Sequence, residues 1–217
     1  MTKAYYYLPG DQKHKDDLSA LYRVDQAGEL GAVQIYTGQL RGVQNPSAEL
    51  TATLTEMKGH EEEHFTEFNR LIASNQTRPS LLHPLWRRLG FAIGFLTARS
   101  GIPSAMSLTV AVEDEINEHY LEQLKHLPSP TNISPSDHLP QKAETIADDS
   151  KTKAKKPSTA PSPTQSLADK IEQFRQEELL HRDTALEQGA KEMRFYKVFY
   201  PVVRGLSRLA INVAKKI

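Results

Sequence analysis

Two Glu-x-x-His motifs are the features of this 217-residue chain whose residue types and spacing could do chemistry. They are EEEH at positions 61–64 and ELLH at positions 178–181. Residues three apart on a helix differ by about 60° in azimuth, so one helix can direct both side chains of a motif at the same region. A carboxylate and an imidazole placed in this way can bind a metal ion. Either motif alone is weak, because charged helix faces produce such pairs by chance.

The composition excludes several other kinds of site. The chain has no Cys, which rules out disulfide scaffolds, thiol catalysis, cysteine-ligated zinc, iron–sulfur clusters and a rubrerythrin-like peroxidase. Its 27 Lys and Arg balance its 27 Asp and Glu, which argues against a dedicated nucleic-acid binder. Any metal must therefore be held by carboxylate and imidazole.

Four segments have apolar residues at alternating spacings of three and four, which predicts long amphipathic helices. Asn45-Pro46, Pro128 and Gly189 mark expected helix ends. Helices with one apolar stripe each bury those stripes most simply in an antiparallel four-helix bundle, so the predicted fold class is all-α. The first helix is expected at about 17–41, and the other three stripes run over 50–71, 106–127 and 167–185.

Each predicted stripe is interrupted, in register, by a glutamate or by a glutamate and a histidine. A carboxylate that faces a bundle core without a partner is strongly destabilising, and Lys and Arg are absent from the stripes at this level. Metal is therefore the best explanation. One Glu from each of two helices, with a Glu-x-x-His pair from each of two others, is the ligand set of ferritin-like di-iron bundles, and four carboxylates neutralise two divalent ions. The six candidate ligands are Glu29, Glu61, His64, Glu113, Glu178 and His181.

Longer segments around these positions resemble the demethoxyubiquinone hydroxylases of ubiquinone biosynthesis. The resemblance covers the chain outside 128–166. It implies that Glu29, Glu61 and His64 bind one iron, that Glu113, Glu178 and His181 bind the other, and that Glu61 and Glu178 are the catalytic bridging ligands. The segments that carry it are RVDQAGELGAVQIYTGQL (23–40), EEEHFTEFN (61–69), AVEDEINEHYLEQL (111–124) and RQEELLHRD (175–183).

The reaction that the resemblance implies is hydroxylation of the ring of a polyprenyl methoxy-methyl-benzoquinol by a di-iron monooxygenase. The implied cofactors are two Fe ions, with O2 as cosubstrate and NADH as the expected electron donor. No Gly-x-Gly-x-x-Gly motif follows a predicted strand, so a nicotinamide would bind without a Rossmann module. His119 and Tyr120 resemble a family His-Tyr pair near the site and are the candidate substrate-binding residues, with a structural role for His119 as the alternative.

Two acid-free, basic and apolar segments, 81–101 and 193–217, predict additional amphipathic interfacial helices that lie on a membrane. The first contains Trp86, and Pro201 is expected to start or kink the helix in the second. The alternative is that both segments pack on the bundle or on another subunit. No stretch reaches the 18 to 20 apolar residues, roughly, that a spanning helix needs. The expected location is peripheral, on the cytoplasmic face of the bacterial cell membrane, since the first residues lack the apolar core of a secretory signal.

The predicted domain organisation is one folded domain with an insertion. Residues 1–127 would supply the first three bundle helices and the interfacial segment 81–101, and residues 167–217 the fourth bundle helix and the C-terminal amphipathic helix. Residues 128–166 are rich in Pro, Ser, Thr and Lys and predict a disordered surface insertion. The expected partners are a lipid surface and a polyprenyl quinol, with a lipid-presenting protein of ubiquinone biosynthesis and a second copy of the chain as further hypotheses, and no nucleic acid.

Two rival functions remain open at this point. A bacterioferritin-like iron-oxidation and storage protein has much the same ligand pattern, but a basic amphipathic segment suits anionic lipid better than a soluble iron-storing shell. A non-enzymatic helical bundle on a membrane surface would have merely solvated glutamates, and it predicts no metal and no change of stability on chelation.

Overall fold

The computed structural model describes residues 12–127 and 163–215, and in this part of the chain it contains helices and no strand. The prediction of an all-α fold is confirmed. The elements are α1 (Gln12–Gly42), α2 (Ala48–Ser74), α3 (His83–Arg99), α4 (Ile102–His126), α5 (Pro163–Glu187), the short 3-10 helix η2 (Ala190–Glu192) and α6 (Tyr196–Ala214).

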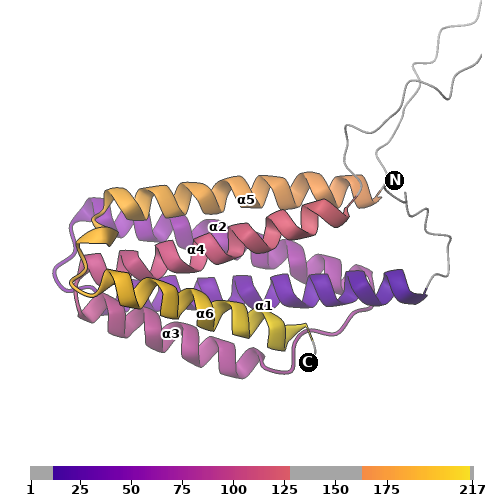
Figure 1. The fold of residues 1–217 in the computed structure, drawn as a ribbon, viewed down its shortest axis with the longest axis horizontal. Helices are drawn as coiled ribbons and strands as arrows, with labels where there is room; N and C mark the ends of the chain where they lie inside the picture. Colours follow the sequence, from indigo (N-terminus) through magenta and orange to yellow (C-terminus); the bar gives the residue numbers. More distant parts are fainter. Residues whose placement is uncertain (1–11, 128–162, 216–217) are drawn as a thin grey trace, which may run out of the picture.

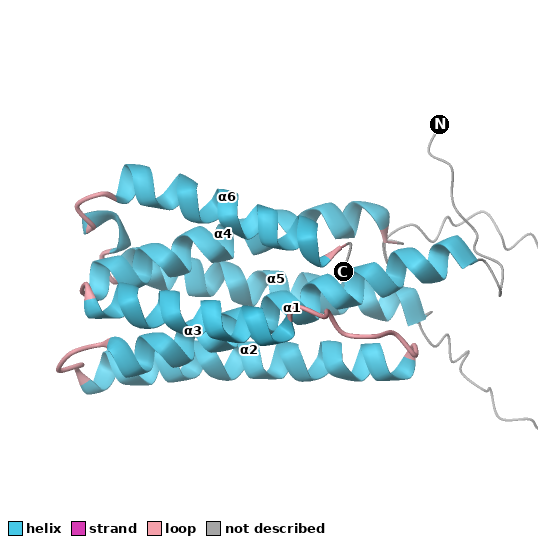
Figure 2. Ribbon diagram, turned by 90° about the horizontal axis from the view of Figure 1, so that it is seen from below, coloured by secondary structure: helices cyan, strands magenta, loops and turns pink. Residues whose placement is uncertain are grey.

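Helices α1, α2, α4 and α5 form the four-helix bundle (Figure 1). A short connection joins α1 to the antiparallel α2, and α4 is likewise antiparallel to α5. Helix α3 runs back along α1, so that α4 starts at the same end of the bundle as α2 (Figures 1 and 2). Helix α6 packs mainly on α4 and also contacts α1. Two additional helices therefore cover one side of the bundle.

Local sequence signals set several helix ends. The Ser47 side chain accepts a hydrogen bond of 3.0 Å from the Leu50 backbone N–H and caps the start of α2. Gly189, with φ of 86°, follows the end of α5 in the left-handed conformation that glycine adopts without strain.

Two expected helix boundaries differ from the observed ones. Helix α5 begins at Pro163, four residues before the expected start at position 167. The rest of the expected insertion, 128–162, lies outside the described residues. Pro201 does not start the C-terminal helix, because α6 begins at Tyr196 and contains Pro201 within it.

Apolar side chains fill the bundle on both sides of the candidate ligands. One cluster lies toward the α1–α2 connection and another toward the opposite end, and the glutamates and histidines interrupt the stripes between them. This arrangement keeps the candidate ligands away from bulk water. The first cluster includes Leu50, Leu54, Met57, Met106, Val110 and Ala185, and the second Tyr22, Phe68, Ile72, Ile171 and Phe174.

Helix α3 packs against α1 through small residues. An added Cβ at Gly94 would collide with the backbone of Ile35 on α1, and one at Gly38 on α1 would collide with the backbone of Phe91. Only glycine permits backbones to approach this closely. Segment 81–101 therefore packs on the bundle along one side, while large apolar residues such as Leu89 and Leu96 stay exposed.

Candidate metal centre

The six candidate ligands come together in the middle of the bundle. Each is at most 2% exposed. They form two overlapping groups in which one ligand atom per residue lies within 4.8 Å of the others. Both groups contain Glu61 and Glu178, which is the arrangement expected of bridging carboxylates. The first group adds Glu29 and His64, and the second adds Glu113 and His181.

The two histidines direct their Nδ1 atoms at the carboxylates. His181 Nδ1 lies 3.1 Å from Glu61 Oε1 and 3.2 Å from Glu178 Oε2. His64 Nδ1 lies 3.2 Å from Glu178 Oε1, and 3.6 Å from Glu29 Oε2. Each Nδ1 atom thus faces a carboxylate from another helix as well as the one in its own motif.

The hydrogen-bond inventory tests whether these residues fit a pair of metal ions. Buried polar atoms in proteins are nearly always hydrogen-bonded, yet eight buried atoms of this cluster lack a hydrogen-bond partner in the described part of the chain. All eight belong to the six candidate ligands, and together they would give each of two ions several oxygen ligands and one nitrogen ligand. They are Glu29 Oε2, both oxygens of Glu61, His64 Nδ1, Glu113 Oε2, both oxygens of Glu178 and His181 Nδ1.

The electrostatics of the cluster point the same way. Burial, and then repulsion by neighbouring carboxylates, raise the pKa of Glu61 and of Glu113 well above the ordinary value. Against the effect of burial, the two histidines hold the pKa of Glu178 at about 2. Also against burial, the surrounding carboxylates raise the pKa of His64 to about 11. Without cations, the cluster therefore retains protons that divalent ions would displace.

Comparison with known proteins identifies the family. The family profile described as ubiquinone biosynthesis protein COQ7 matches residues 16–214. The chain belongs to the COQ7 family. This match includes all six candidate ligands and supports neither the iron-storage alternative nor the non-enzymatic one.

Individual COQ7-family relatives are similar over most of their length. A protein of Rhodospirillum rubrum named 3-demethoxyubiquinol 3-hydroxylase is 35% identical over 210 residues, which are 97% of this chain and 83% of the relative. The mitochondrial 5-demethoxyubiquinone hydroxylase of Saccharomyces cerevisiae is 35% identical over 92% of this chain and 78% of its own length. The human mitochondrial protein named NADPH-dependent 3-demethoxyubiquinone 3-hydroxylase is 32% identical over 91% of this chain and 76% of its own length. The relatives are thus named as hydroxylating oxidoreductases.

Two buried tyrosines hydrogen-bond to Glu29 and Glu113, the two glutamates that belong to only one ligand group each. Tyr36 Oη donates a hydrogen bond of 2.8 Å to Glu113 Oε1, and Tyr120 Oη donates one to Glu29 Oε1. Each tyrosine leaves the second oxygen of its glutamate free of hydrogen bonds from the described residues. Sequence reasoning missed this role of Tyr36, although Tyr36 follows Glu29 by seven positions, as Tyr120 follows Glu113. This repeated spacing was the sequence signal for it.

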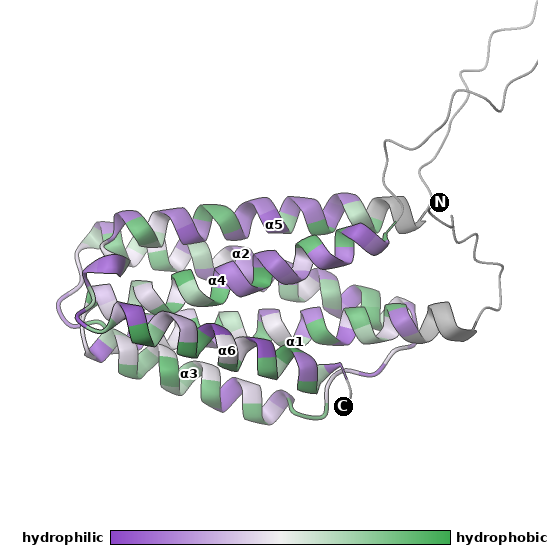
Figure 3. Cartoon of the chain, in the orientation of Figure 1, coloured by the Kyte–Doolittle hydropathy of each residue, from purple (hydrophilic) through white to green (hydrophobic). Residues whose placement is uncertain are grey.

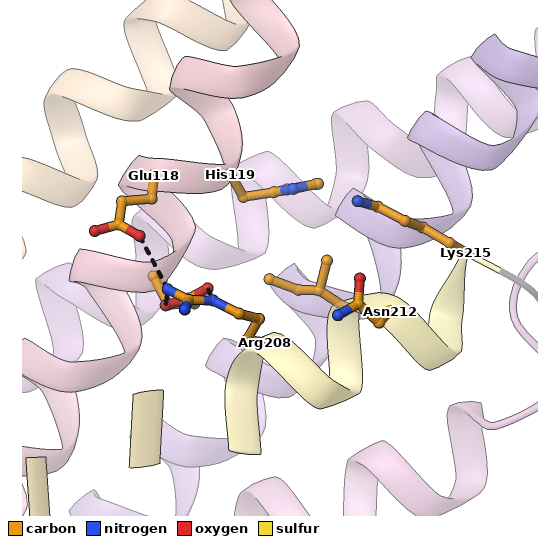
Figure 4. Close-up of a pocket in the computed structure, with 7 residues that line it drawn as sticks. Glu118, His119, Arg208, Asn212 and Lys215 are labelled. Carbon is orange, nitrogen blue, oxygen red and sulfur yellow. Dashed lines mark hydrogen bonds and ion pairs between the residues drawn. The ribbon is translucent and has the colours of Figure 1, made fainter. Parts of the chain in front are cut away.

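The structure places His119 and Tyr120 in different surroundings. Tyr120 points into the candidate metal centre, whereas His119 lies 3.1 Å from Asp25 Oδ1 and lines a pocket of about 390 Å³ between α4 and α6. His119 and Lys215 project toward each other across this pocket (Figure 4). Substrate contact by either residue of the pair stays a prediction.

The side chains of α3 and α6 are divided between the bundle and the surface. Hydrophobic residues alternate with hydrophilic ones along both helices (Figure 3). Trp86 packs against the cluster of Val24, Ala27 and Ala214 rather than projecting outward as an interfacial anchor would. Arg204 and Arg208 of α6 form ion pairs with α4. In the described part of the chain, each helix is too short or too polar to cross a bilayer.

Proposed function

We propose that this chain is a di-iron monooxygenase that hydroxylates the ring of demethoxyubiquinol in ubiquinone biosynthesis, the substrate class that the names of its relatives give for those proteins. The observation that carries the proposal is the set of eight buried oxygen and nitrogen atoms that could bind metal and that lack hydrogen-bond partners among the described residues. They lie on four helices of a COQ7-family chain. Iron rather than manganese rests on the family, since both accept these ligands. When bound, the iron ions supply the activation of O2 for insertion of one oxygen atom into the ring.

The protein's own residues supply geometry and exclusion of water. Glu61 and Glu178 would hold both ions together, because each lies in both ligand groups. Phe174 covers His64 with ring centroids 4.0 Å apart, and Phe68 packs on Phe174. These apolar rings keep water from the candidate ligands on that side, which would protect the chemistry of a bound metal centre from competing reactions with water.

The pocket beside His119 is the proposed approach to the site for the substrate. His119 lines it, and the next residue, Tyr120, donates a hydrogen bond to Glu29 in the metal centre. The pocket wall is thus one residue along α4 from a side chain that hydrogen-bonds to a candidate metal ligand. The electron donor is a reduced nicotinamide. NADH is the predicted form, whereas the human relative is named NADPH-dependent.

A peripheral position on the cytoplasmic face of a bacterial membrane is proposed from the outward sides of α3 and α6. Both helices lie on one side of the bundle and expose large apolar residues in a region that also carries exposed basic side chains. A long-tailed quinol dissolves in lipid, so a lipid-facing enzyme reaches its substrate directly. The exposed apolar residues include Leu81, Leu85, Leu89, Leu96, Phe195, Val198, Val202, Leu206 and Leu209.

Isotope labelling tests the activity. The iron-loaded protein is supplied with NADH or NADPH, a short-tailed demethoxyquinone and 18-O2, and the product is analysed by mass spectrometry. We expect one labelled oxygen on the ring with the wild type and none with Glu178→Ala, while Glu122→Gln, on the exposed surface of α4, matches the wild type. Iron oxidation without ring labelling would refute the hydroxylase and favour storage chemistry.

Vesicle cosedimentation tests the membrane position. Leu206→Glu combined with Leu209→Glu should lower binding to anionic vesicles at least about tenfold, whereas Leu180→Glu, at an equally exposed leucine on α5, should not. Sedimentation of the lipid-free protein shows whether a second copy covers the same surface. If the Leu206/Leu209 variant binds vesicles as well as the wild type, α6 is not the lipid-binding side, and its exposed residues await a protein partner such as a lipid-presenting one.

A further inference from the structure

The metal centre is built from two similar halves. On α1 and α4, a glutamate is followed seven residues later by a tyrosine, as Glu29 by Tyr36 and Glu113 by Tyr120. Each tyrosine donates its hydrogen bond to the glutamate of the other helix. Glu29 and Glu113 therefore have the same kind of hydrogen-bond partner, a tyrosine hydroxyl from the facing helix.

The two histidine ligands follow the same plan, with one difference. In each Glu-x-x-His motif, the residue immediately before the glutamate contacts the histidine of the other motif. Glu177 Oε2 on α5 lies 2.6 Å from His64 Nε2 on α2, and His60 Nδ1 on α2 lies 3.0 Å from His181 Nε2 on α5. The outer partner of each histidine is the group that contacts its Nε2 atom, on the side away from the carboxylate cluster. For His64 it is a carboxylate, whereas for His181 it is an imidazole.

The geometry at His60 fits a hydrogen-bond acceptor. His181 directs Nδ1 at Glu61 and Glu178. With a metal ion on Nδ1, the hydrogen of the ring would be on Nε2, which would donate it to His60 Nδ1 at 3.0 Å. The two rings are nearly parallel, with an interplanar angle of 9° and centroids 5.2 Å apart, which fixes the orientation of the His181 ring. His60 is half-buried, and its ring contacts a candidate ligand.

We propose that this difference makes the two metal positions unequal, with the ion at His64 bound more tightly than the ion at His181, and that His60 is the positioning residue for His181. The proposal rests on the metal centre of the proposed function. A carboxylate that accepts the outer N–H of a ligating imidazole makes that imidazole a stronger donor, and it does so more than a neutral imidazole can. Since the tyrosines are equivalent, the outer partners of the histidines are the difference that remains among these contacts.

Stepwise metal titration tests the inequality without using activity. Metal-free protein is titrated with Co2+ under calorimetry, and the wild type should bind two ions in two resolved steps. His60→Ala should weaken the weaker step about 10- to 100-fold and leave the tighter step within about twofold. His60→Gln, whose amide oxygen can accept the same hydrogen bond, should restore most of the loss. Glu63→Ala, at an exposed position of the same motif, is the matched control and should change neither step.

An exchange of the two partners gives a sharper test. His60→Glu alone should bring the two steps together, because both histidines then face a carboxylate. In protein loaded with 57-Fe, the wild type should give two Mössbauer doublets of different quadrupole splitting, and His60→Glu should narrow that difference. The double variant His60→Glu/Glu177→His should restore two unequal steps. Circular dichroism of the metal-free variants checks that each is folded.

The outcomes separate this inference from the proposed function. Two equal steps in the wild type, or equal weakening of both steps by His60→Ala, would overturn the inference and leave the metal centre intact. Absence of Co2+ and iron binding by the folded wild type would overturn the metal centre and the inference together.

Discussion

The packing of α3 on α1 through glycine gives opposite expectations for one substitution at two positions. An ideal Cβ at Gly94 would lie 2.9 Å from the Cα and the carbonyl carbon of Ile35, and backbone atoms cannot rotate away, so the helices must separate. At Gly59 in α2, an added Cβ has no neighbour within 4 Å in the described part of the chain. Glycine to alanine in a helix interior gains about 1 kcal/mol of helix propensity at both positions. That gain cancels when the two variants are compared.

The difference between Gly94→Ala and Gly59→Ala is therefore the steric cost alone. Overpacking costs about 1–3 kcal/mol. In a domain of this size, 1 kcal/mol shifts Tm by roughly 2–4 °C, so Gly94→Ala should melt about 2–12 °C below Gly59→Ala. Thermal unfolding of the metal-free proteins, followed by far-ultraviolet circular dichroism, measures the difference. If Gly94→Ala were as stabilising as Gly59→Ala, α3 would not pack on α1 in this way.

Three further predictions concern the metal centre and α6. Tyr36→Phe should weaken metal binding about 10- to 100-fold in competition with a chelator, because Glu113 loses its hydrogen bond, and unchanged affinity would contradict that role. Metal binding should release protons and weaken as pH falls, because the pKa of Glu61 is raised and that of His64 is about 11. Calorimetric heats that do not depend on the ionisation enthalpy of the buffer would argue against proton release. Glu115→Gln should lower stability by about 1–3 kcal/mol and speed proteolysis within α6, because buried Glu115 binds two arginines of that helix, whereas exposed Glu118→Gln should cost under about 1 kcal/mol.

The positions of the six candidate ligands were predictable because the information is local. A glutamate in register with an apolar stripe must face the core, and the energy of burying it demands a partner. The same periodicity places Tyr36 in the core. It does not predict the hydrogen bond of Tyr36 to Glu113, which depends on how α1 is rotated relative to α4. His60 lies outside the stripe of α2, so its contact with His181 depends on the setting of α2 against α5. Contacts of this kind are set by tertiary packing rather than by spacing along one helix.

Segments 81–101 and 193–217 show why composition alone could not decide between lipid and bundle. A helix on the outside of a bundle has one side that packs on the bundle and another that faces outward, and different residues form the two sides. On α6, Val203 packs on α4 while Leu206 and Leu209 remain exposed, and Arg204 pairs with Glu115 instead of facing lipid headgroups. Counting all basic and apolar residues as interfacial therefore overstates the membrane signal. The apolar residues of α6 that do not pack on the bundle form an exposed row on the same side as α3. This row is the part of the predicted membrane contact that a vesicle-binding measurement tests.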